Sequence, residues 1–593
     1  MQLYKISDYI IDFFKAQGIK HIFLVSGGAS IHLLHSANSI SGIVPVPTHH
    51  EQGAAMAADG YARSTGFLGL AIATSGPGAT NLLTGIAGAW FDSIPCIFIS
   101  GQVATFRMKN SMKIRQLGFQ ETDIVAMARP ITKFAVQIKT VSRLEEVLKI
   151  SINMALSGRP GPVLIDIPDD LQRSHAHFNP PSKVMNHKLS NNGLSYVKQF
   201  KKIENLLRNS KRPIIILGAG ANTQATRKLS QKLIKTLNIP VLTTWGAKDL
   251  IPYDDTKLIG TFGSHGTRYG NFAVQNSDLI IVLGSRLSSR EIGGDLQTWA
   301  RVAKIVHVDI DKTESDKFKF LGRELDLKIN SNLYDFIPQF IDFSEKYLSN
   351  CTYREWFEWI DVRKKKYGYK TSGNVHELDG YDFYLILNDF LRENDQIFLD
   401  TGCTVAWAMQ SLSLPAGSRT YHDFNNTAMG WALPAAIGGA LSSPLKRTIV
   451  ISGDGSIMMN IQELATAMRY APNLKIIVLN NSGYGMVRQT EDQWLNGVNV
   501  GTSSKIGDIQ FPNFTSLAKS FGYKVGKATS RMELKMHLKS LFLDNSIGFL
   551  EVEINKDAKV IPQTRFGYPL EDSEPELPKE ELIENMIIPV LRE

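Results

Sequence analysis

The sequence predicts an α/β protein made of three doubly wound parallel-sheet domains. Short apolar runs such as HIFLVSG, PIIILGAG and TIVISGDG end in Gly, Ser or Asp, and helix-like stretches separate them along the chain. This alternation is typical of βαβ units, in which parallel strands carry helices on both faces. A length of 593 residues is too great for one hydrophobic core, so several domains are expected.

Changes in composition divide the chain. The first α/β segment spans 1–172, and a polar stretch rich in Asn, Ser, His and Pro follows at 173–195, as is typical of a domain boundary. The second segment spans 196–345 and the third 375–560. The first and third are candidates for related sheets. The Pro- and Glu-rich residues 561–593 are expected to extend over the surface.

The charge balance argues against a nucleic-acid partner. The 65 basic and 57 acidic side chains give a net charge of +8, which is a weak bias at this length. The run Arg363–Lys366 lacks interleaved aromatic residues, so a solvated helix face is the favoured interpretation.

Cysteine usage and hydropathy argue against a secreted or membrane protein. Cys96, Cys351 and Cys403 form an odd, sparse set without a CxxC motif, which disfavours a disulfide framework or a zinc site. They fit a reducing cytoplasm, and we expect a cytoplasmic protein. The N-terminus, MQLYKISDYIIDFFKAQGIK, predicts an amphipathic helix rather than a signal peptide. No apolar run approaches the ~20 residues that span a bilayer.

Two polar clusters follow neighbouring strands of the third segment. Asp454 closes TIVISGDG and Asn481 closes LKIIVLNN, with the helix-like IQELATAMRY between them. Parallel strands joined in this way end at the same edge of the sheet, which is where open α/β sheets bind ligands. Carboxylate and amide oxygens suit Mg²⁺ with a diphosphate, and Gly453 and Gly455 let the backbone approach phosphate. GDG alone would fit an ordinary βαβ turn, whereas the spacing to Asn481 favours a metal site.

This GDG…NN pattern resembles the diphosphate and metal motif of thiamine-diphosphate enzymes. The resemblance implies that the third segment binds the diphosphate and that the first segment, from a partner subunit, binds the pyrimidine ring. It also implies that Asp454, Asn481 and the main-chain oxygen of Gly483 bind Mg²⁺. A homodimer is then the smallest complete unit, and a tetramer is the alternative.

The other half of the site is expected around Glu51. Thiamine must lose its C2 proton, and in this family a carboxylate near the pyrimidine promotes that loss. HEQGAAMAADGYARSTG, followed by ATSGPGATN at 73–81, resembles the family's pyrimidine-binding domain and assigns that role to Glu51. The alternative is a helix N-terminal charge favoured by the dipole. The resemblance assigns further cofactor contacts to Ser75, Gly76, Asn81, Gln102, Gly402, Met429, Gly453, Gly455 and Met486.

Most of the chain resembles the catalytic subunit of acetohydroxyacid (acetolactate) synthases. LGFQETDIVAMARPITKFAV at 117–136 is similar to their substrate-channel segment. The resemblance places Phe119, Gln120 and Lys133 in the catalytic site, with Gly28. It implies that a 2-oxo acid such as pyruvate is decarboxylated and that the two-carbon unit is joined to a carbonyl acceptor. A regulatory subunit is a further possible partner.

The second segment resembles the FAD-binding stretch of the same family. FGSHGTRYGNFAVQNSDLIIVLGSRLSSREIGG carries the HGT…GSR…R spacing. The resemblance implies a FAD that is kept largely for structural reasons. The expected contacts are Gly218, Gly220, Gly266, Arg286 and Arg290.

The acceptor side departs from the synthase pattern. The resemblance assigns substrate contacts to Val487 and Thr490. The family has tryptophan where Thr490 stands, and that tryptophan favours 2-oxobutyrate as acceptor. The family's Tyr-Pro-Gly-Gly is replaced at 25–28, and its DVGQHQ is replaced at 400–405. These changes leave other acceptors open, such as a nucleotide-linked keto-sugar.

Other functions remain as alternatives. Simple 2-oxo acid decarboxylation is one, since His49 and His50 form a pair of a kind found in decarboxylases of the family. A homologue that binds the cofactor without turnover is another. A FAD- or NAD-dependent dehydrogenase would rest on the second segment alone.

Overall fold

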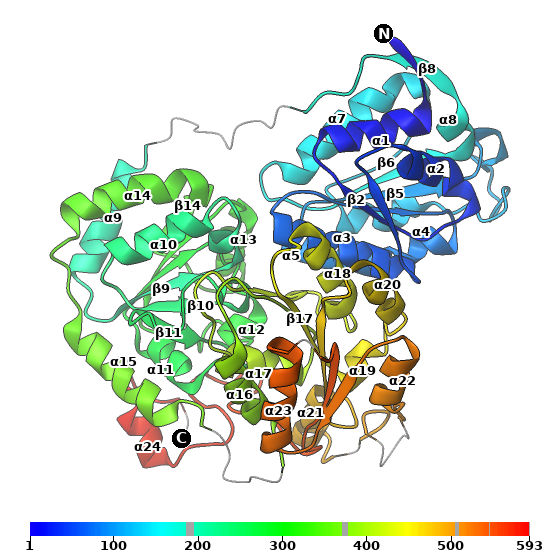
Figure 1. Ribbon diagram of the computed structural model, residues 1–593. Coiled ribbons are helices and arrows are strands. Elements are labelled where there is room, and N and C mark those ends of the chain that lie inside the picture. Colours follow the sequence, from blue (N-terminus) through cyan, green and yellow to red (C-terminus); the bar gives the residue numbers. More distant parts are fainter. Residues whose placement is uncertain (185–194, 371–376, 498, 504–508, 545, 592–593) are drawn as a thin grey trace.

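The computed structural model describes residues 1–184, 195–370, 377–497, 499–503, 509–544 and 546–591. These residues form three parallel six-stranded sheets and one small antiparallel sheet. Helices flank each large sheet, as Figure 1 shows. The predicted fold class is therefore confirmed, whereas the proposed linker residues 185–194 and the start of the third segment at 375–376 lie outside the described residues.

The N-terminal sheet has the strand order β3-β2-β4-β5-β7-β6. Its central strands β4 and β5 are completely buried, as expected for a sheet with helices on both faces. Its strands are β2 His21–Leu24, β3 Val44–Pro47, β4 Gly69–Ala73, β5 Cys96–Gln102, β6 Phe134–Gln137 and β7 Val163–Pro168. Its helices are α1 Ile6–Ala16, α2 Ile31–Ser39, α3 Glu51–Thr65, α4 Pro77–Asn81, α5 Leu83–Asp92, α6 Ile124–Ala128, α7 Leu144–Leu156 and α8 Asp169–Arg173.

The N-terminus differs from the expected helix. Gln2–Lys5 form strand β1, which pairs antiparallel with β8, His175–Phe178, and α1 begins only at Ile6. Strand β8 lies in the stretch expected to be an irregular linker. The pairing joins segments far apart in sequence, so local periodicity could not predict it.

The central sheet has the order β11-β10-β9-β12-β13-β14. The chain moves outward in one direction from β9 to β11 and in the other from β12 to β14, so β9 and β12 flank a topological switch point. Its strands are β9 Pro213–Leu217, β10 Val241–Thr243, β11 Leu258–Thr261, β12 Leu279–Leu283, β13 Lys304–Asp309 and β14 Leu327–Asn330. Its helices are α9 Val197–Arg208, α10 Arg227–Thr236, α11 Arg268–Asn276, α12 Ser289–Ile292, α13 Lys312–Phe320 and α14 Leu333–Tyr347.

The C-terminal sheet has the order β16-β15-β17-β18-β20-β19, which repeats the topology of the N-terminal sheet strand for strand. The expected relationship between the first and third segments is therefore confirmed at the level of topology. Its strands are β15 Gln396–Leu399, β16 Arg419–Tyr421, β17 Thr448–Gly453, β18 Lys475–Asn480, β19 Val525–Ala528 and β20 Phe549–Glu553. Its helices are α16 Gly380–Leu387, α17 Cys403–Ser411, α18 Ala432–Ser442, α19 Asp454–Ile457, α20 Glu463–Tyr470, α21 Gly485–Trp494, α22 Phe514–Ser520 and α23 Arg531–Phe542.

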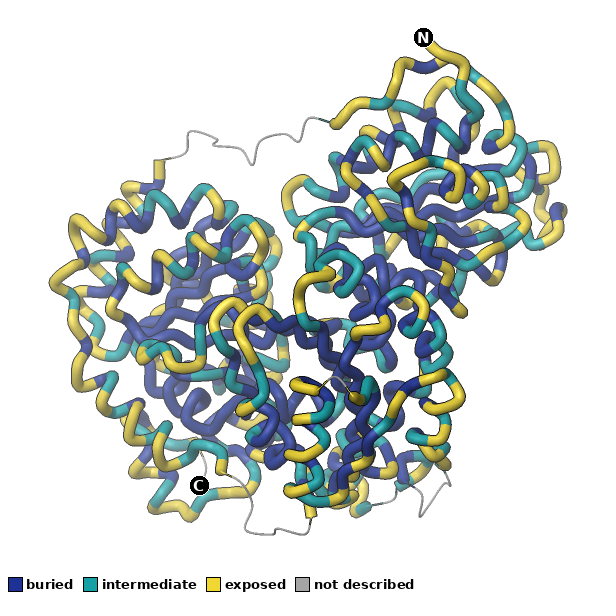
Figure 2. Tube along the Cα trace, in the orientation of Figure 1, coloured by how far each residue is buried: buried dark blue, intermediate teal, exposed yellow. Residues whose placement is uncertain are grey.

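Small residues bring the N- and C-terminal domains together through α3 and α18. A Cβ atom at Gly60 would lie 2.1 Å from the Ala435 carbonyl oxygen, and one at Gly438 would lie 2.0 Å from that of Ala57. The two helix backbones therefore touch, and Figure 2 shows the chain buried along this contact. The contact fixes the two domains of one chain relative to each other.

Residues 561–591 pack against the central domain. Leu570 belongs to the central hydrophobic core, and Arg301 forms a 2.8 Å ion pair with the buried Glu571. The helix α24, Lys579–Glu584, lies against α15, Arg354–Tyr367, where Lys366 pairs with Glu581 at 2.8 Å. Part of the basic run at 363–366 thus holds this extension. Among the described residues, no helix combines the length and apolar character needed to cross a bilayer.

Candidate functional site

Asp454 and the residues after β18 meet at the carboxyl edge of the C-terminal sheet. Strands β17 and β18 pair in parallel with Gly453 opposite Leu479, which brings Asp454 beside the loop at 481–483. Its Oδ2 atom accepts a 3.0 Å hydrogen bond from the Gly483 amide, and Oδ1 accepts one of 2.7 Å from Gly455. Burial raises the pKa of Asp454 to about 6, although these amides oppose the shift.

Glycines allow this loop to close around Asp454. A Cβ atom at Gly483 would lie 2.3 Å from the Thr502 carbonyl oxygen, and one at Gly485 would lie 2.5 Å from Nδ2 of Asn481. Ser482 between them has a φ of 55°, in the left-handed region. Asn481 itself is buried beside this turn. A buried carboxylate, a buried amide and a constrained main chain therefore gather at one point.

The neighbouring strand end leaves open space. Gly402 follows β15 with a φ of 85°, and a Cβ atom there would meet nothing within 4 Å. Asp400 accepts hydrogen bonds from Ser452 and from the amide of Gly430, and so fixes the backbone next to Met429. Strands β15 and β17 flank the switch point of this sheet, where a ligand crevice is expected. These oxygen groups beside an open glycine edge fit a hard divalent cation with a diphosphate.

Helix α21 presents the predicted substrate residues next to this loop. Val487 and Thr490 are exposed, Met486 is half-buried, and the Thr490 hydroxyl donates to the Met486 carbonyl at 3.0 Å. A hollow of about 320 Å³ adjoins the helix. Arg488, which sequence reasoning did not select, lines this hollow and lies near Gly483.

In the N-terminal domain, Glu51 begins α3 and is held by Asn81. The Nδ2 atom of Asn81 donates to Oε2 of Glu51 at 2.9 Å, and a Cβ atom at Gly78 would lie 3.1 Å from Oε1. His50 caps the helix, since its Nδ1 atom accepts from the amide of Gln52. The structure thus brings Glu51 and Asn81 together.

Further predicted residues surround the corresponding switch point, between β2 and β4. Gly28 is exposed, and a Cβ atom there would meet nothing within 4 Å, as at Gly402. Ser75 is buried, and Gly76 contacts Gln120, where both residues have a positive φ. The neighbouring Phe119 is 84% exposed, so this side of the site faces outward from the chain.

Gln102 and Lys133 have partners elsewhere in the domain. The Nε2 atom of Gln102 donates to the Thr122 carbonyl and to Asp166, at 2.9 and 3.1 Å. Lys133 donates to the Ser157 carbonyl at 2.5 Å, and burial lowers the pKa of its amine. The family resemblance assigned a role in the site to both residues, but the sequence could not predict the direction in which each side chain points.

In the central domain, Gly218 and Gly220 lie at the switch point between β9 and β12. A Cβ atom at Gly218 would lie 2.2 Å from the Gly284 carbonyl oxygen, so a larger residue would not fit, and Gly220 packs beside the same glycine. Gly266 closes the turn after β11, since its Cβ atom would overlap Phe262. Close-packed glycines at a switch point are typical of α/β sheets that bind dinucleotides.

The two predicted arginines of this domain have different environments. The Arg290 guanidinium lies 4.4 Å from the Trp245 ring centroid, and burial lowers its pKa. Arg286 donates to Oδ1 of Asn425 at 2.7 Å, and Nδ2 of Asn425 donates to Asp92 at 2.6 Å. Asn425 therefore joins all three domains.

His265 marks a buried polar site beside Arg290. Its ring nitrogens are buried and have no hydrogen-bond partner among the described residues. Burial and, to a smaller extent, the charge of Arg290 together lower the pKa of His265 to about 3. An unpartnered imidazole in this crevice fits a ligand with hydrogen-bonding groups.

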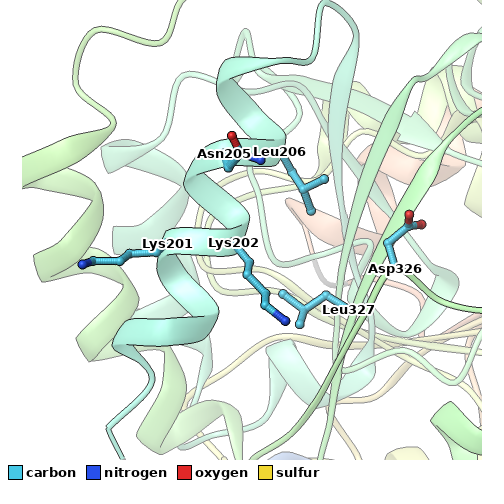
Figure 3. A pocket seen from close by; sticks show the side chains of 6 residues that line it. All are labelled: Lys201, Lys202, Asn205, Leu206, Asp326 and Leu327. Atoms are coloured by element: carbon cyan, nitrogen blue, oxygen red, sulfur yellow. The ribbon is translucent and has the colours of Figure 1, made fainter.

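A second hollow, of about 350 Å³, lies on the outside of the central domain. It is formed by α9 and the start of β14, and Asp326 and Leu327 lie across from Lys202 (Figure 3). No residue predicted for cofactor or substrate lines it.

Comparison with known proteins places each domain. Residues 4–127 match a model described as the thiamine pyrophosphate enzyme N-terminal TPP binding domain, and residues 400–553 match the C-terminal TPP binding domain. Residues 200–336 match the central domain of the same enzymes. The chain belongs to the thiamine pyrophosphate enzyme family. It is a thiamine-pyrophosphate-dependent enzyme.

Relatives are similar over nearly the whole chain. Acetolactate synthase 2, chloroplastic, of Nicotiana tabacum is 33% identical over 577 residues, which cover 95% of this chain and 84% of the tobacco protein. The probable acetolactate synthase large subunit of Methanocaldococcus jannaschii is 33% identical, with 95% and 93% covered. The acetolactate synthase large subunit of Lactococcus lactis is 30% identical, with 95% and 94% covered. The resemblance to this family is confirmed.

Sequence reasoning missed Glu463 in this thiamine pyrophosphate enzyme. It stands inside the crossover helix between Asp454 and Asn481 and contacts the turn before Glu51. A glutamate at the start of the amphipathic run IQELATAMRY was the available signal.

Proposed function

We propose that the enzyme decarboxylates pyruvate, or a similar 2-oxo acid, on thiamine diphosphate and joins the two-carbon unit to a carbonyl acceptor, as an acetolactate synthase. The observation that carries this proposal is that two sheets of the same strand order each carry polar residues of the expected kind after the carboxyl ends of their strands. One holds Glu51 against Asn81, and the other holds Asp454 beside Asn481. The names of the relatives support the same reaction.

Mg²⁺ and the cofactor would be held by the two halves described above. Asp454, Asn481 and the main-chain oxygen of Gly483 supply metal ligands of a suitable type. Glu51 would exchange a proton with the pyrimidine ring, and Met429 and Met486 would supply apolar contacts to the cofactor. Bound thiamine diphosphate supplies the electron sink for decarboxylation, while the protein binds, orients and excludes water.

The complete site requires a second copy of the chain in this proposal. Phe119 and Phe106 are 84% and 68% exposed, and Gln120, next to Phe119, contacts Gly76 of the predicted cofactor set. Exposed apolar groups next to a site favour a protein interface. We infer a homodimer or a tetramer.

FAD is proposed for the central crevice. The strand order, the close-packed Gly218 and Gly220, and the unpartnered ring of His265 support a dinucleotide there. The proposed FAD contacts also include Gly266, Arg286 and Arg290. We expect the flavin to have a structural role, because the proposed reaction involves no net oxidation.

Two further features extend the proposal. Several relatives are named large subunits, so a small regulatory partner is proposed here as well. The three cysteines are unpaired, which favours a reducing, cytoplasmic setting.

Product analysis tests the function. Purified protein is given pyruvate, thiamine diphosphate, Mg²⁺ and FAD, and acetolactate is quantified over time beside a Glu51→Gln variant. Rapid acetolactate formation that the variant loses supports a synthase. Unchanged carboligation in the variant contradicts the proposed role of Glu51.

A second candidate is transfer to a different acceptor. The exposed Thr490 replaces the large tryptophan of the synthase pattern, which leaves more room beside α21. Slow release of CO₂ and acetaldehyde with little acetolactate would favour this candidate. Nucleotide-linked keto-sugars and aldehydes would then be tested as acceptors.

A further inference from the structure

The turn that carries Glu51 is held by a carboxylate from the C-terminal domain. Glu463 is the first residue of α20, and its side chain is completely buried. Its Oε1 atom accepts hydrogen bonds from the backbone amides of His49 and His50, at 3.0 and 3.2 Å. These are the two residues immediately before Glu51. In Figure 1, α20 lies beside α3 at the contact between the two domains.

The Glu463 side chain has little freedom to move. Its Oε2 atom accepts a 2.6 Å hydrogen bond from the Thr466 hydroxyl. A Cβ atom at Gly53, in the first turn of α3, would lie 2.6 Å from Oε1. The glycine therefore provides the space that the carboxylate occupies, and the carboxylate is fixed under the start of α3.

Neutral donors satisfy this buried carboxylate. Among the described residues, Glu463 has no ion pair with Lys or Arg, and its partners are two amides and a hydroxyl. Burial raises the pKa of Glu463, while Thr466 and the two amides lower it. A buried carboxylate is costly unless hydrogen-bonded, so these three bonds resist displacement of the turn.

We propose that Glu463 is a positioning residue that fixes the direction of Glu51 toward the pyrimidine ring, an inference that rests on the proposed thiamine-dependent function. It acts through the backbone of His49 and His50. Asn81 holds the Glu51 side chain, and Glu463 holds the main chain that leads to it. Because the role needs an acceptor and not a charge, glutamine should replace Glu463 with small effect, whereas alanine should not.

Amide hydrogen exchange in the cofactor-free protein tests the contact itself. In Glu463→Ala, the His49 and His50 amides lose their acceptor, and we expect them to exchange at least about 10-fold faster. In Glu463→Gln, Oε1 remains, and exchange should stay within about 3-fold of the wild type. Peptides covering 44–56 report this change without any contribution from catalysis.

Exchange of the C2 proton of bound thiamine diphosphate for deuterium tests the consequence. Samples are quenched in acid and read by proton NMR. Glu463→Ala should slow this exchange about 10-fold, and Glu463→Gln less than about 3-fold. The dissociation constants for thiamine diphosphate and Mg²⁺ should change less than about 3-fold, because the hydrogen bonds of Glu463 go to His49, His50 and Thr466 and not to Asp454 or Gly483. If the alanine variant does not fold, Thr466→Val frees Oε2 alone, and about 2- to 5-fold slowing is expected.

Two results would overturn the proposal. One is unchanged exchange at His49, His50 and C2 in Glu463→Ala, or in Thr466→Val if that variant has to be used. The other is a glutamine variant as slow as the alanine variant, since positioning requires only the acceptor. If the wild-type enzyme does not accelerate C2 exchange, the thiamine-dependent function itself is wrong, and the role of Glu463 falls with it. The amide measurement distinguishes that failure from loss of the contact.

Discussion

Asn81 holds Glu51 by one hydrogen bond, 2.9 Å from Nδ2 to Oε2, where α4 ends against the start of α3. The other oxygen of Glu51 faces Gly78, which offers no side chain. The direction of this carboxylate therefore depends on a single neutral donor and on the turn before it.

Replacing Asn81 should change the rate and its pH dependence in separable ways. Asn81→Ala removes the donor, and we expect kcat to fall about 10-fold. Asn81→Asp places two carboxylates in contact, which retain a proton more tightly, so the acidic limb of the kcat/KM profile should move up by about one pH unit. Profiles between pH 5 and 9 check both effects. An aspartate variant with the wild-type acidic limb would contradict this geometry.

Asp166 should make stability depend on pH. Burial raises the pKa of Asp166 to about 6, although Gln137, Ser100 and Gln102 donate hydrogen bonds to it. An unfolded aspartate titrates at about 3.9, so between these values the folded chain holds a proton that the unfolded chain releases. The contribution of Asp166 to stability therefore falls as pH rises from about 4 to about 6, by about 3 kcal/mol.

The variant Asp166→Asn tests this sign. It should be less stable than the wild type because Gln102 and Gln137 lose an acceptor. The deficit should be larger at pH 4.5 than at pH 7.5, since only the wild type gains stability as the pH falls. Urea unfolding at both pH values measures the difference, with the exposed Asp316→Asn as control. A deficit that does not change with pH would contradict the prediction.

Thr490→Trp should move acceptor preference toward the synthase pattern. Thr490 is exposed on the face of α21 that also carries Met486, so a tryptophan there would narrow the mouth of the site. We expect the product ratio to shift about 10-fold in favour of 2-oxobutyrate over pyruvate. Competition between the two acceptors at equal concentration measures the ratio. Thr490→Val, which preserves volume, should leave it near the wild-type value.

Arg290→Met should weaken flavin binding. Arg290 is a half-buried cation over Trp245, with no ion pair among the described residues. Loss of a charge-assisted contact to a diphosphate should cost about 10-fold in affinity. Titration of flavin fluorescence at constant ionic strength measures this, and Lys319→Met on exposed α13 controls for net charge. Wild-type affinity in Arg290→Met would exclude this arginine from the site.

The local parts of the site were predictable from sequence. Asp454 and Asn481 end strands that are adjacent in both sequence and sheet, so their convergence follows from βαβ topology alone. The role of Glu51 was predicted because the glycines and alanines that follow it match the pattern of the pyrimidine-binding domain in thiamine-diphosphate enzymes. The alternation of strand and helix patterns along the chain was enough to predict that these residues lie at the edge of a sheet.

Contacts between distant segments were not predictable in this way. Glu463 touches His49 across 414 positions, and Asn425 touches Asp92 across 333. The hydrophobic periodicity of the sequence does not predict these contacts, because they depend on how α3 packs against α18. Lys133 illustrates the same limit within one domain, because its length allows several directions and packing against Gly161 selects one.

The extension over the central domain has a consequence for synthesis of the chain. The central sheet ends at Asn330, but Leu570 completes its core, Gln275 contacts Glu571 and Asn276 contacts Asn585. A ribosome adds about 5–20 residues per second, so these partners emerge on the order of tens of seconds after the sheet they cover. During that interval the apolar surface that Leu570 covers is exposed, and the side-chain amides of Gln275 and Asn276 lack these partners. Chaperone occupancy of nascent chains should therefore persist until residues 570–585 have left the ribosome.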